Sequence, residues 1–199
     1  MTAESYSGYF RNGIKNGKGT FTYSDGSTFT GEYQEGEKTG VGVIYYDNGD
    51  KFDGMFEKDQ ANGKGVMFYH NQDRYEGNWV DGEKSGYGVY SFYKGGSSAD
   101  VYEGEWFEGN MNGKGTMSYH NGDKYVGEWC DGKREGLGMY INKNGDVYDG
   151  YWQEDLKAGN GQLKMKNGEI YDGLWKSGLK DGLGDFYFMN GDFYSVAPL

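Results

Sequence analysis

One repeated pattern constrains this chain more than any other feature. Tyr or Phe recurs at residues 6, 29, 52, 75, 102, 125, 148, 171 and 194, at a constant spacing apart from one longer step between 75 and 102. With each of these residues counted as position 1, all 38 glycines except Gly96 fall on positions 3, 8, 12, 14 and 21, and Gly95 and Gly96 lie in the insertion. A fixed period over a whole chain predicts an array of identical structural units, each in contact with its neighbours.

The pattern sets the expected domain organisation. We expect one continuous repeat array over residues 1–199, with eight full repeats, a partial ninth from residue 194 and an insertion near residues 94–99. The first repeat begins after five residues without an evident polar cap, which is compatible with a longer array.

The repeat at residues 102–124 illustrates the expected local structure. Residues 102–107 and 115–119 alternate between the two faces with a period of two, which predicts two strands. Residues 109–113 between them are expected to form a loop of about half a dozen residues. Asn121-Gly122 then favours a tight type I′ turn that leads into the next repeat. Each repeat is therefore predicted to be a β-hairpin.

The glycine at position 3 lies between two aromatic residues on the same face, where it leaves room for a ring from a neighbouring strand. We therefore expect an all-β fold, an elongated single-layer antiparallel meander of tandem 23-residue hairpins with an aromatic groove. With strands about 4.8 Å apart, eight hairpins predict a rod of order 80 Å. The twist of the strands is expected to coil it.

The aromatic residues at position 5 are the candidate partner-binding residues, because a one-layer sheet has no second layer to cover them. They are Phe10, Tyr33, Phe56, Trp79, Trp106, Trp129, Trp152 and Trp175. Two alternatives remain open at this point. The rings either pack only on one another, or they pack and also leave a surface for a partner helix or extended segment.

The pattern Tyr-x-Gly-x-Trp-x-x-Gly, followed by Gly-x-Gly and Asn-Gly, resembles the MORN repeat (membrane occupation and recognition nexus). Tyr75–Trp79, Tyr102–Trp106 and Tyr125–Trp129 match it well, and the resemblance covers residues 6–194. It implies a β-hairpin ribbon with scaffold or adaptor roles. Without an appended domain, the chain is most similar to the cytoskeletal MORN proteins of protozoan parasites. The repeats depart from the pattern at Asp59, Asp155 and Gln72, which replace glycines.

Charge and cysteine usage narrow the functional classes. The 31 acidic and 20 basic residues give a net charge of −11, spread evenly without a basic cluster. This argues against nucleic acid and against anionic lipid, although a phospholipid-binding tethering module remains the alternative function. Cys130 is the only cysteine, and there is no signal-peptide pattern. We therefore expect a cytoplasmic, cytoskeleton-associated protein.

Catalysis requires unlike groups that converge in a pocket, whereas a repeat array presents the same group many times. His70 and His120 are expected to be solvated turn residues, and Cys130 a free thiol on a strand. The Gly-x-Gly pairs lack the context of a phosphate-binding loop. We therefore predict no catalytic residue, no cofactor and no metal site within the chain, although ligands from a second molecule leave a shared metal site open.

Apolar residues accumulate toward the last repeats, where position 9 changes from glutamate to leucine. Solenoid ends are normally polar, and an unpaired strand edge beside apolar side chains invites pairing with a second chain. We therefore predict a homodimer through the C-terminal repeats. The expected interface residues are Leu156, Leu174, Leu179, Leu183, Tyr187, Phe193, Tyr194 and Val196. The alternative is that these residues fold over the last hairpin and cap it.

Overall fold

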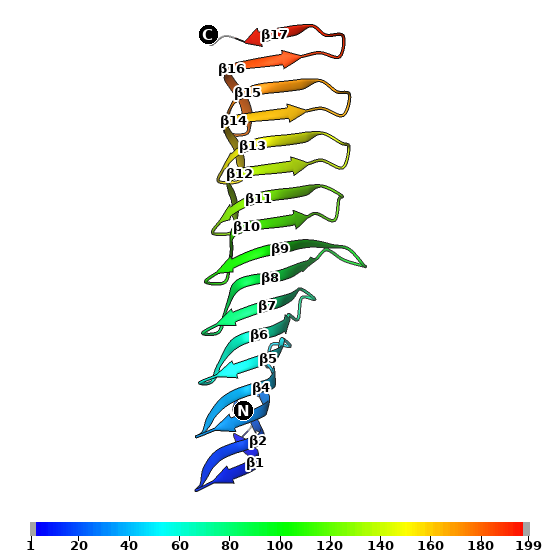
Figure 1. The fold of residues 1–199 in the computed structure, drawn as a ribbon. Helices are drawn as coiled ribbons and strands as arrows, with labels where there is room; N and C mark the ends of the chain where they lie inside the picture. The colour runs from blue at the N-terminus through cyan, green and yellow to red at the C-terminus, as the bar shows by residue number, and fades with distance from the viewer. Residues whose placement is uncertain (1–2, 197–199) are drawn as a thin grey trace. The chain divides into compact units, whose positions relative to one another are not determined.

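The structure, a computed structural model, describes residues 3–196 and contains seventeen β-strands in this range (Figure 1). No helix in the described part is long and apolar enough to cross a membrane. The strands form an open antiparallel sheet built of tandem hairpins. This confirms the all-β hairpin fold predicted from the repeat pattern.

The chain divides into two compact units, and it passes from one to the other at the insertion. The first unit contains residues up to Tyr93 and Trp106–Gly109, and the second contains Lys94–Glu105 and the residues from Asn110 onward. The strands that precede the insertion are β1 (Ser5–Arg11), β2 (Ile14–Thr22), β3 (Thr28–Gln34), β4 (Glu37–Tyr45), β5 (Lys51–Glu57), β6 (Gln60–Phe68), β7 (Arg74–Val80) and β8 (Glu83–Tyr93). The later strands are β9 (Ala99–Phe107), β10 (Asn110–Ser118), β11 (Lys124–Cys130), β12 (Lys133–Ile141), β13 (Val147–Gln153), β14 (Leu156–Lys164), β15 (Ile170–Lys176), β16 (Leu179–Tyr187) and β17 (Phe193–Val196).

Within each unit, the glycines at positions 3 and 14 face one another across successive strands. Gly31 pairs with Gly42, which pairs in turn with Gly54. In the second unit, Gly127 and Gly138 are paired in the same way. The aromatic ring at position 1 lies over these glycines, in the space that a Cβ atom would occupy. The glycine rows therefore leave room for the rings, as expected, but at position 3 the ring comes from the same strand, two residues earlier, and not from a neighbouring strand.

The structure corrects the predicted placement of the tight turn. The type I′ geometry requires positive φ at two successive residues, and it occurs inside the repeat, at Glu108 (46°) and Gly109 (79°). The Asn121-Gly122 prediction was wrong, because in the connection over residues 119–123 only Gly122 has a positive φ, of 94°. The Asn121 side chain instead accepts a hydrogen bond from the backbone N–H of Asp123.

The predicted loop over residues 109–113 is also wrong, because β10 begins at Asn110. The second strand of a hairpin starts immediately after the two-residue turn and absorbs extra residues in a bulge. In the β11–β12 hairpin, Gly127 pairs with Gly138 but Trp129 pairs with Arg134, so the second strand has two extra residues. Gly136 in this bulge has a φ of 67°. Glycine at position 12 thus permits a bulge rather than a loop.

Aspartate replaces the turn glycine in two repeats for a structural reason. Asp59 and Asp155 adopt φ values of 69° and 67°, in the left-handed region that aspartate tolerates. The carboxylate of Asp155 accepts hydrogen bonds from the backbone N–H and from Nε of Arg134, at 3.0 and 2.9 Å. Asp59 accepts one from the backbone N–H of Lys38. These side-chain bonds connect each turn to the preceding hairpin.

Candidate functional site

The aromatic residues at position 5 form the core of the sheet together with those at position 1. Tyr33, Phe56 and the five tryptophans are only 3–6% exposed, whereas Phe10 is 59% exposed. Neighbouring rings meet edge to face, as in the Tyr125–Trp152 pair at 5.4 Å and 83°. We call this side of the sheet the aromatic face. The seven buried rings present little surface, so contacts on this face fall mainly on the residues that border them.

The polar tips of the rings bond to backbone carbonyls. Trp152 donates from Nε1 to the carbonyl of Gly138 at 3.0 Å, and the Tyr148 hydroxyl donates to the carbonyl of Tyr151 at 2.9 Å. Burial raises the pKa of Tyr148 to about 12, so its hydroxyl remains a donor at neutral pH. The Tyr33 hydroxyl is buried without a hydrogen-bond partner among the described residues.

A row of cations borders the rings on the aromatic face, and we call it the cation row. It consists of the basic residues at position 10 of six repeats: Lys15, Lys38, Lys84, Arg134, Lys157 and Lys180. Each cation lies over two or three rings, with charge-to-centroid distances from 4.2 to 6.0 Å. Such cation–π contacts contribute about 0.5–2 kcal/mol each, depending on desolvation.

The cation row was not predicted from the sequence, although its signal was present. The same position carries Lys or Arg in six of eight repeats, with Ala61 and Met111 as the exceptions. The row was overlooked because position 10 was assigned to a loop. In the structure it belongs to the second strand of each hairpin, where it pairs with the aromatic residue at position 5, as Lys15 does with Phe10.

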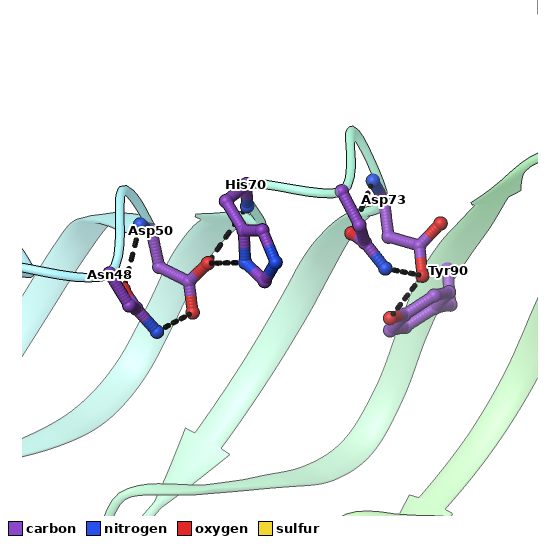
Figure 2. A network of polar contacts seen from close by, with 6 residues as sticks. Asn48, Asp50, His70, Asp73 and Tyr90 are labelled. Carbon is purple, nitrogen blue, oxygen red and sulfur yellow. Dashed lines mark hydrogen bonds and ion pairs between the residues drawn. The ribbon is translucent and has the colours of Figure 1, made fainter.

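The connections between successive repeats are joined to one another by side-chain hydrogen bonds, and we call this series of contacts the ladder. Figure 2 shows part of it. The Asp50 carboxylate accepts hydrogen bonds from the backbone N–H of His70 at 2.8 Å and from the side-chain amide of Asn48. It also lies 3.1 Å from Nδ1 of the His70 ring. Asp73 accepts from the Tyr90 hydroxyl at 3.0 Å. Although burial acts to raise it, the bonds from His70 hold the pKa of Asp50 below its usual value.

The two histidines lie in these turns as expected. His70 and His120 are exposed, and each ring lies beside the aspartate of the preceding turn, Asp50 or Asp100. No group of three or more His, Cys, Asp or Glu side chains in residues 3–196 is arranged to hold a metal ion. The ladder thus joins successive turns through side chains about one repeat apart, which the repeat pattern alone did not indicate.

The family model of the MORN repeat matches this chain eight times, at residues 6–28, 29–51, 52–74, 75–97, 102–124, 125–147, 148–170 and 171–193. The chain belongs to the MORN-repeat family. Its matched repeats begin at the positions that the sequence pattern predicted, and they leave residues 98–101 unmatched, whereas the insertion was predicted near residues 94–99. A search of curated proteins gives no match.

Solved structures with the same fold include the wild-type TCP10 domain of CPAP from Danio rerio. The domain in complex with a peptide of Danio rerio STIL has a TM-score of 0.58 and 10% identity, over 98% of this chain and 84% of that chain. A second structure of the wild-type domain has a TM-score of 0.52 and 11% identity, over 92% and 84%. At these identities the likeness shows the fold alone.

The opposite face of the MORN sheet is hollowed where the glycines leave the backbone bare. In the second unit, a cavity of about 620 Å³ is lined by Glu105, Glu128, Cys130, Glu135 and Tyr151, among others. Cys130 is an exposed free thiol on β11, as expected. This hollow therefore lies on the face that was expected to be solvated.

The residues predicted for the dimer interface are uncovered in the last MORN repeats. Leu156, Leu174, Leu179, Leu183, Tyr187, Phe193 and Tyr194 are 37–72% exposed. The strand β17 pairs with β16, and the rings of Tyr187 and Phe193 stack at 6.3 Å, without folding over the last hairpin. The side chain of Val196 lies outside the described part of the structure.

Proposed function

We propose that this chain is a non-enzymatic scaffold or adaptor that associates with itself and binds protein partners. The observation that carries the proposal is a contrast between two sets of apolar residues. The rings of the core are already packed, whereas large side chains such as Val41, Leu137 and Leu179 are left more than half exposed. Exposed apolar patches of this kind are typical of protein interaction sites. The CPAP domain of similar fold, solved with a STIL peptide, supports a protein-binding role.

We propose that self-association produces a homodimer through the C-terminal repeats. The support is the set of exposed residues on β14 to β17 that also comprised the predicted interface. Burial of apolar surface stabilises by about 25 cal/mol per Å², so several leucines and tyrosines together supply a substantial driving force. A two-fold axis closes such a contact without further growth.

The proposed setting is the cytoplasm, in association with the cytoskeleton. It rests on the resemblance to all-repeat cytoskeletal MORN proteins and on the single cysteine, which suits a reducing compartment. The alternative function, tethering to phospholipid, is disfavoured by the net charge of −11, because an evenly acidic protein is repelled by anionic membranes.

The test is the mass of the full chain by light scattering at tens of micromolar. We expect a dimer, and we expect a variant with Leu156, Leu174, Leu179 and Leu183 changed to Glu to be a folded monomer. The control changes four exposed apolar residues of the first unit to Glu, namely Val41, Tyr45, Met55 and Val80, and is expected to remain a dimer. A monomeric wild-type chain, or a dimeric leucine variant, would contradict the proposed interface.

A further inference from the structure

The five lysines of the cation row make no ion pair. No carboxylate of residues 3–196 lies within 4 Å of Lys15, Lys38, Lys84, Lys157 or Lys180. Arg134 is the exception in the row, because Asp155 neutralises it. Only five of the 20 lysines and arginines make an ion pair within residues 3–196, so what distinguishes the lysines of the row is their position over the aromatic rings, as for Lys157 over Trp175 at 4.8 Å.

These charges are also partly desolvated and act on one another. Burial lowers the pKa of Lys84, and Asp73 only partly opposes this. Burial lowers the pKa of Lys157, and the neighbouring charges of Arg134 and Lys180 lower it further, against Asp146. An anion seated on the row would therefore gain from two sources, the attraction to each cation and the relief of repulsion between neighbours.

The spacing between successive cations of the row favours one backbone conformation in an acidic ligand. Successive cations are two strands apart, which is about 9.6 Å. A polyproline II segment has three residues per turn and rises about 3.1 Å per residue, so it presents the same side every 9.3 Å or so. An extended β-strand presents the same face about every 6.6 Å. An α-helix completes a turn in about 5.4 Å, so neither conformation matches one cation per repeat.

Tyrosines border part of the row. The Tyr23 hydroxyl accepts a hydrogen bond from Nζ of Lys38 at 3.1 Å, so position 18 borders the cations directly. Tyr46, Tyr69 and Tyr119 occupy the same position in other repeats, whereas the last three repeats have Asn142, Met165 and Phe188 there. Aromatic surfaces are the usual docking sites of polyproline II segments, because these segments are already extended and lose little entropy on binding.

We propose that the cation row docks an extended acidic segment of a partner protein, in polyproline II conformation, with a carboxylate at every third residue. The proposal rests on the protein-binding function proposed above and specifies its ligand. The longest uninterrupted stretch is Arg134, Lys157 and Lys180 in three consecutive repeats. Ala61 and Met111 interrupt the row, and Asp155 already neutralises Arg134, so Lys157 and Lys180 are the unpaired cations of this stretch and its ligand needs two carboxylates in register with them.

The experiment measures the fluorescence anisotropy of a labelled peptide of four Glu-Pro-Pro triplets, titrated with the full chain. A peptide of the same composition with its four glutamates contiguous is the matched comparison. We expect the periodic peptide to bind about tenfold more tightly, a difference of about 1.4 kcal/mol. Equal affinity for the two peptides would overturn the spacing argument, and no binding of either would overturn the proposal without affecting self-association.

Two pairs of lysine substitutions test whether the peptide binds at the cation row. Lys157→Met together with Lys180→Met removes two charges but keeps the apolar stems that cover the rings, and should weaken binding of the periodic peptide about tenfold. The control, Lys114→Met with Lys164→Met, removes two exposed lysines of the opposite face and should leave affinity unchanged. Near-ultraviolet circular dichroism verifies that both variants remain folded. Equal losses in the two variants would show non-specific attraction and overturn the site.

A gain-of-function variant and a lipid probe complete the test. Within the second unit, Met111→Lys extends the row to four consecutive repeats and should tighten binding of the periodic peptide several-fold. Vesicles that contain phosphatidylserine distinguish a lipid headgroup from a peptide carboxylate as the source of the anion. Retention on such vesicles that is lost in the Lys157/Lys180 variant, with no binding of the peptide, would overturn the proposal in favour of lipid.

Discussion

The third and sixth repeats pack the same ring geometry with different chemistry. In the third, Phe52 and Phe56 meet edge to face at 5.3 Å and 86°, and in the sixth, Tyr125 and Trp129 meet at 5.1 Å and 89°. Only the sixth repeat adds bonds from the ring tips to the backbone, from the Tyr125 hydroxyl and from Nε1 of Trp129. The comparison teaches that ring shape and the glycines beneath it determine the fold, while the polar tips add stability.

The largest expected effect tests whether the glycine row is equally necessary in both repeats. An added Cβ at Gly54 would lie 2.6 Å from Gly65 Cα, and at Gly127 it would lie 2.6 Å from Gly138 Cα. We expect Gly54→Ala and Gly127→Ala each to lower the free energy of unfolding by about 3 kcal/mol, measured by urea denaturation.

The control for this pair is Gly26→Ala, a site with open space around the Cβ and a φ of 100°. Its cost should be about 1 kcal/mol, from backbone strain alone. If Gly54→Ala costs no more than the control, steric room for the rings is not what fixes these glycines.

The next effect concerns the tryptophan that distinguishes the two repeats. Trp129→Phe removes ring volume and leaves the carbonyl of Gly115 without its indole donor. We expect a loss of about 2 kcal/mol in the same urea measurement. The reverse change, Phe56→Trp, places an indole at the equivalent position and should cost less than about 1 kcal/mol. If Trp129→Phe and Phe56→Trp lower the free energy of unfolding by the same amount, the packing around these two positions differs between the repeats.

A smaller effect isolates the tyrosine hydroxyl. Tyr125→Phe removes the hydroxyl that donates to the carbonyl of Glu128 at 3.0 Å. This variant should lose about 1 kcal/mol, and Phe52→Tyr should gain a similar amount, because its hydroxyl reaches the equivalent carbonyl of Met55. The double variant, with both changes, should be close to wild type in thermal denaturation. A loss in Phe52→Tyr would contradict the equivalence of the two repeats.

The smallest expected effect is an increase in the free energy of unfolding. The Tyr33 hydroxyl is buried without a partner among residues 3–196, and burial raises its pKa above its ordinary value. Tyr33→Phe should therefore raise the free energy of unfolding by about 0.5–1 kcal/mol, because it removes a desolvated polar group. A stability lower than wild type would indicate that the hydroxyl has a partner in solution.

The sequence predicted the parts of the fold that depend on local pattern. Strands follow from alternation around residues such as Tyr102 and Trp106, and the glycine row follows from the space that a ring requires. The turn was misplaced although Asn12-Gly13, Asp81-Gly82 and Asp131-Gly132 carry its signature at the equivalent position, because the repeat taken as the example has Glu108 there. Asn121-Gly122 has the signature but belongs to a longer connection.

The candidate site was predicted less well, because it depends on contacts between repeats. The ring positions were identified, but their burial is set by the rings of the adjacent repeats. The cation row escaped notice because Lys84 and Lys157 were assigned to loops, although their recurrence at one position was visible. The ladder from Asp50 to His70 joins residues whose polar character suits an isolated turn equally well. Only the register of the hairpins shows that Asp50 and His70 lie side by side.

The ladder of turns has a mechanical consequence. Backbone hydrogen bonds in an antiparallel sheet run at right angles to the strands, so tension on the ends of a unit loads one strand pair at a time. Each hairpin is also hydrogen-bonded to the next at both edges of the sheet. Examples are the bond from Gly132 N–H to the Met111 carbonyl and the bond from Lys143 N–H to the Asp123 carboxylate. Under load, such a unit peels in steps of one repeat, each of which releases about 80 Å of chain. We therefore expect a unit under load to lengthen in discrete amounts.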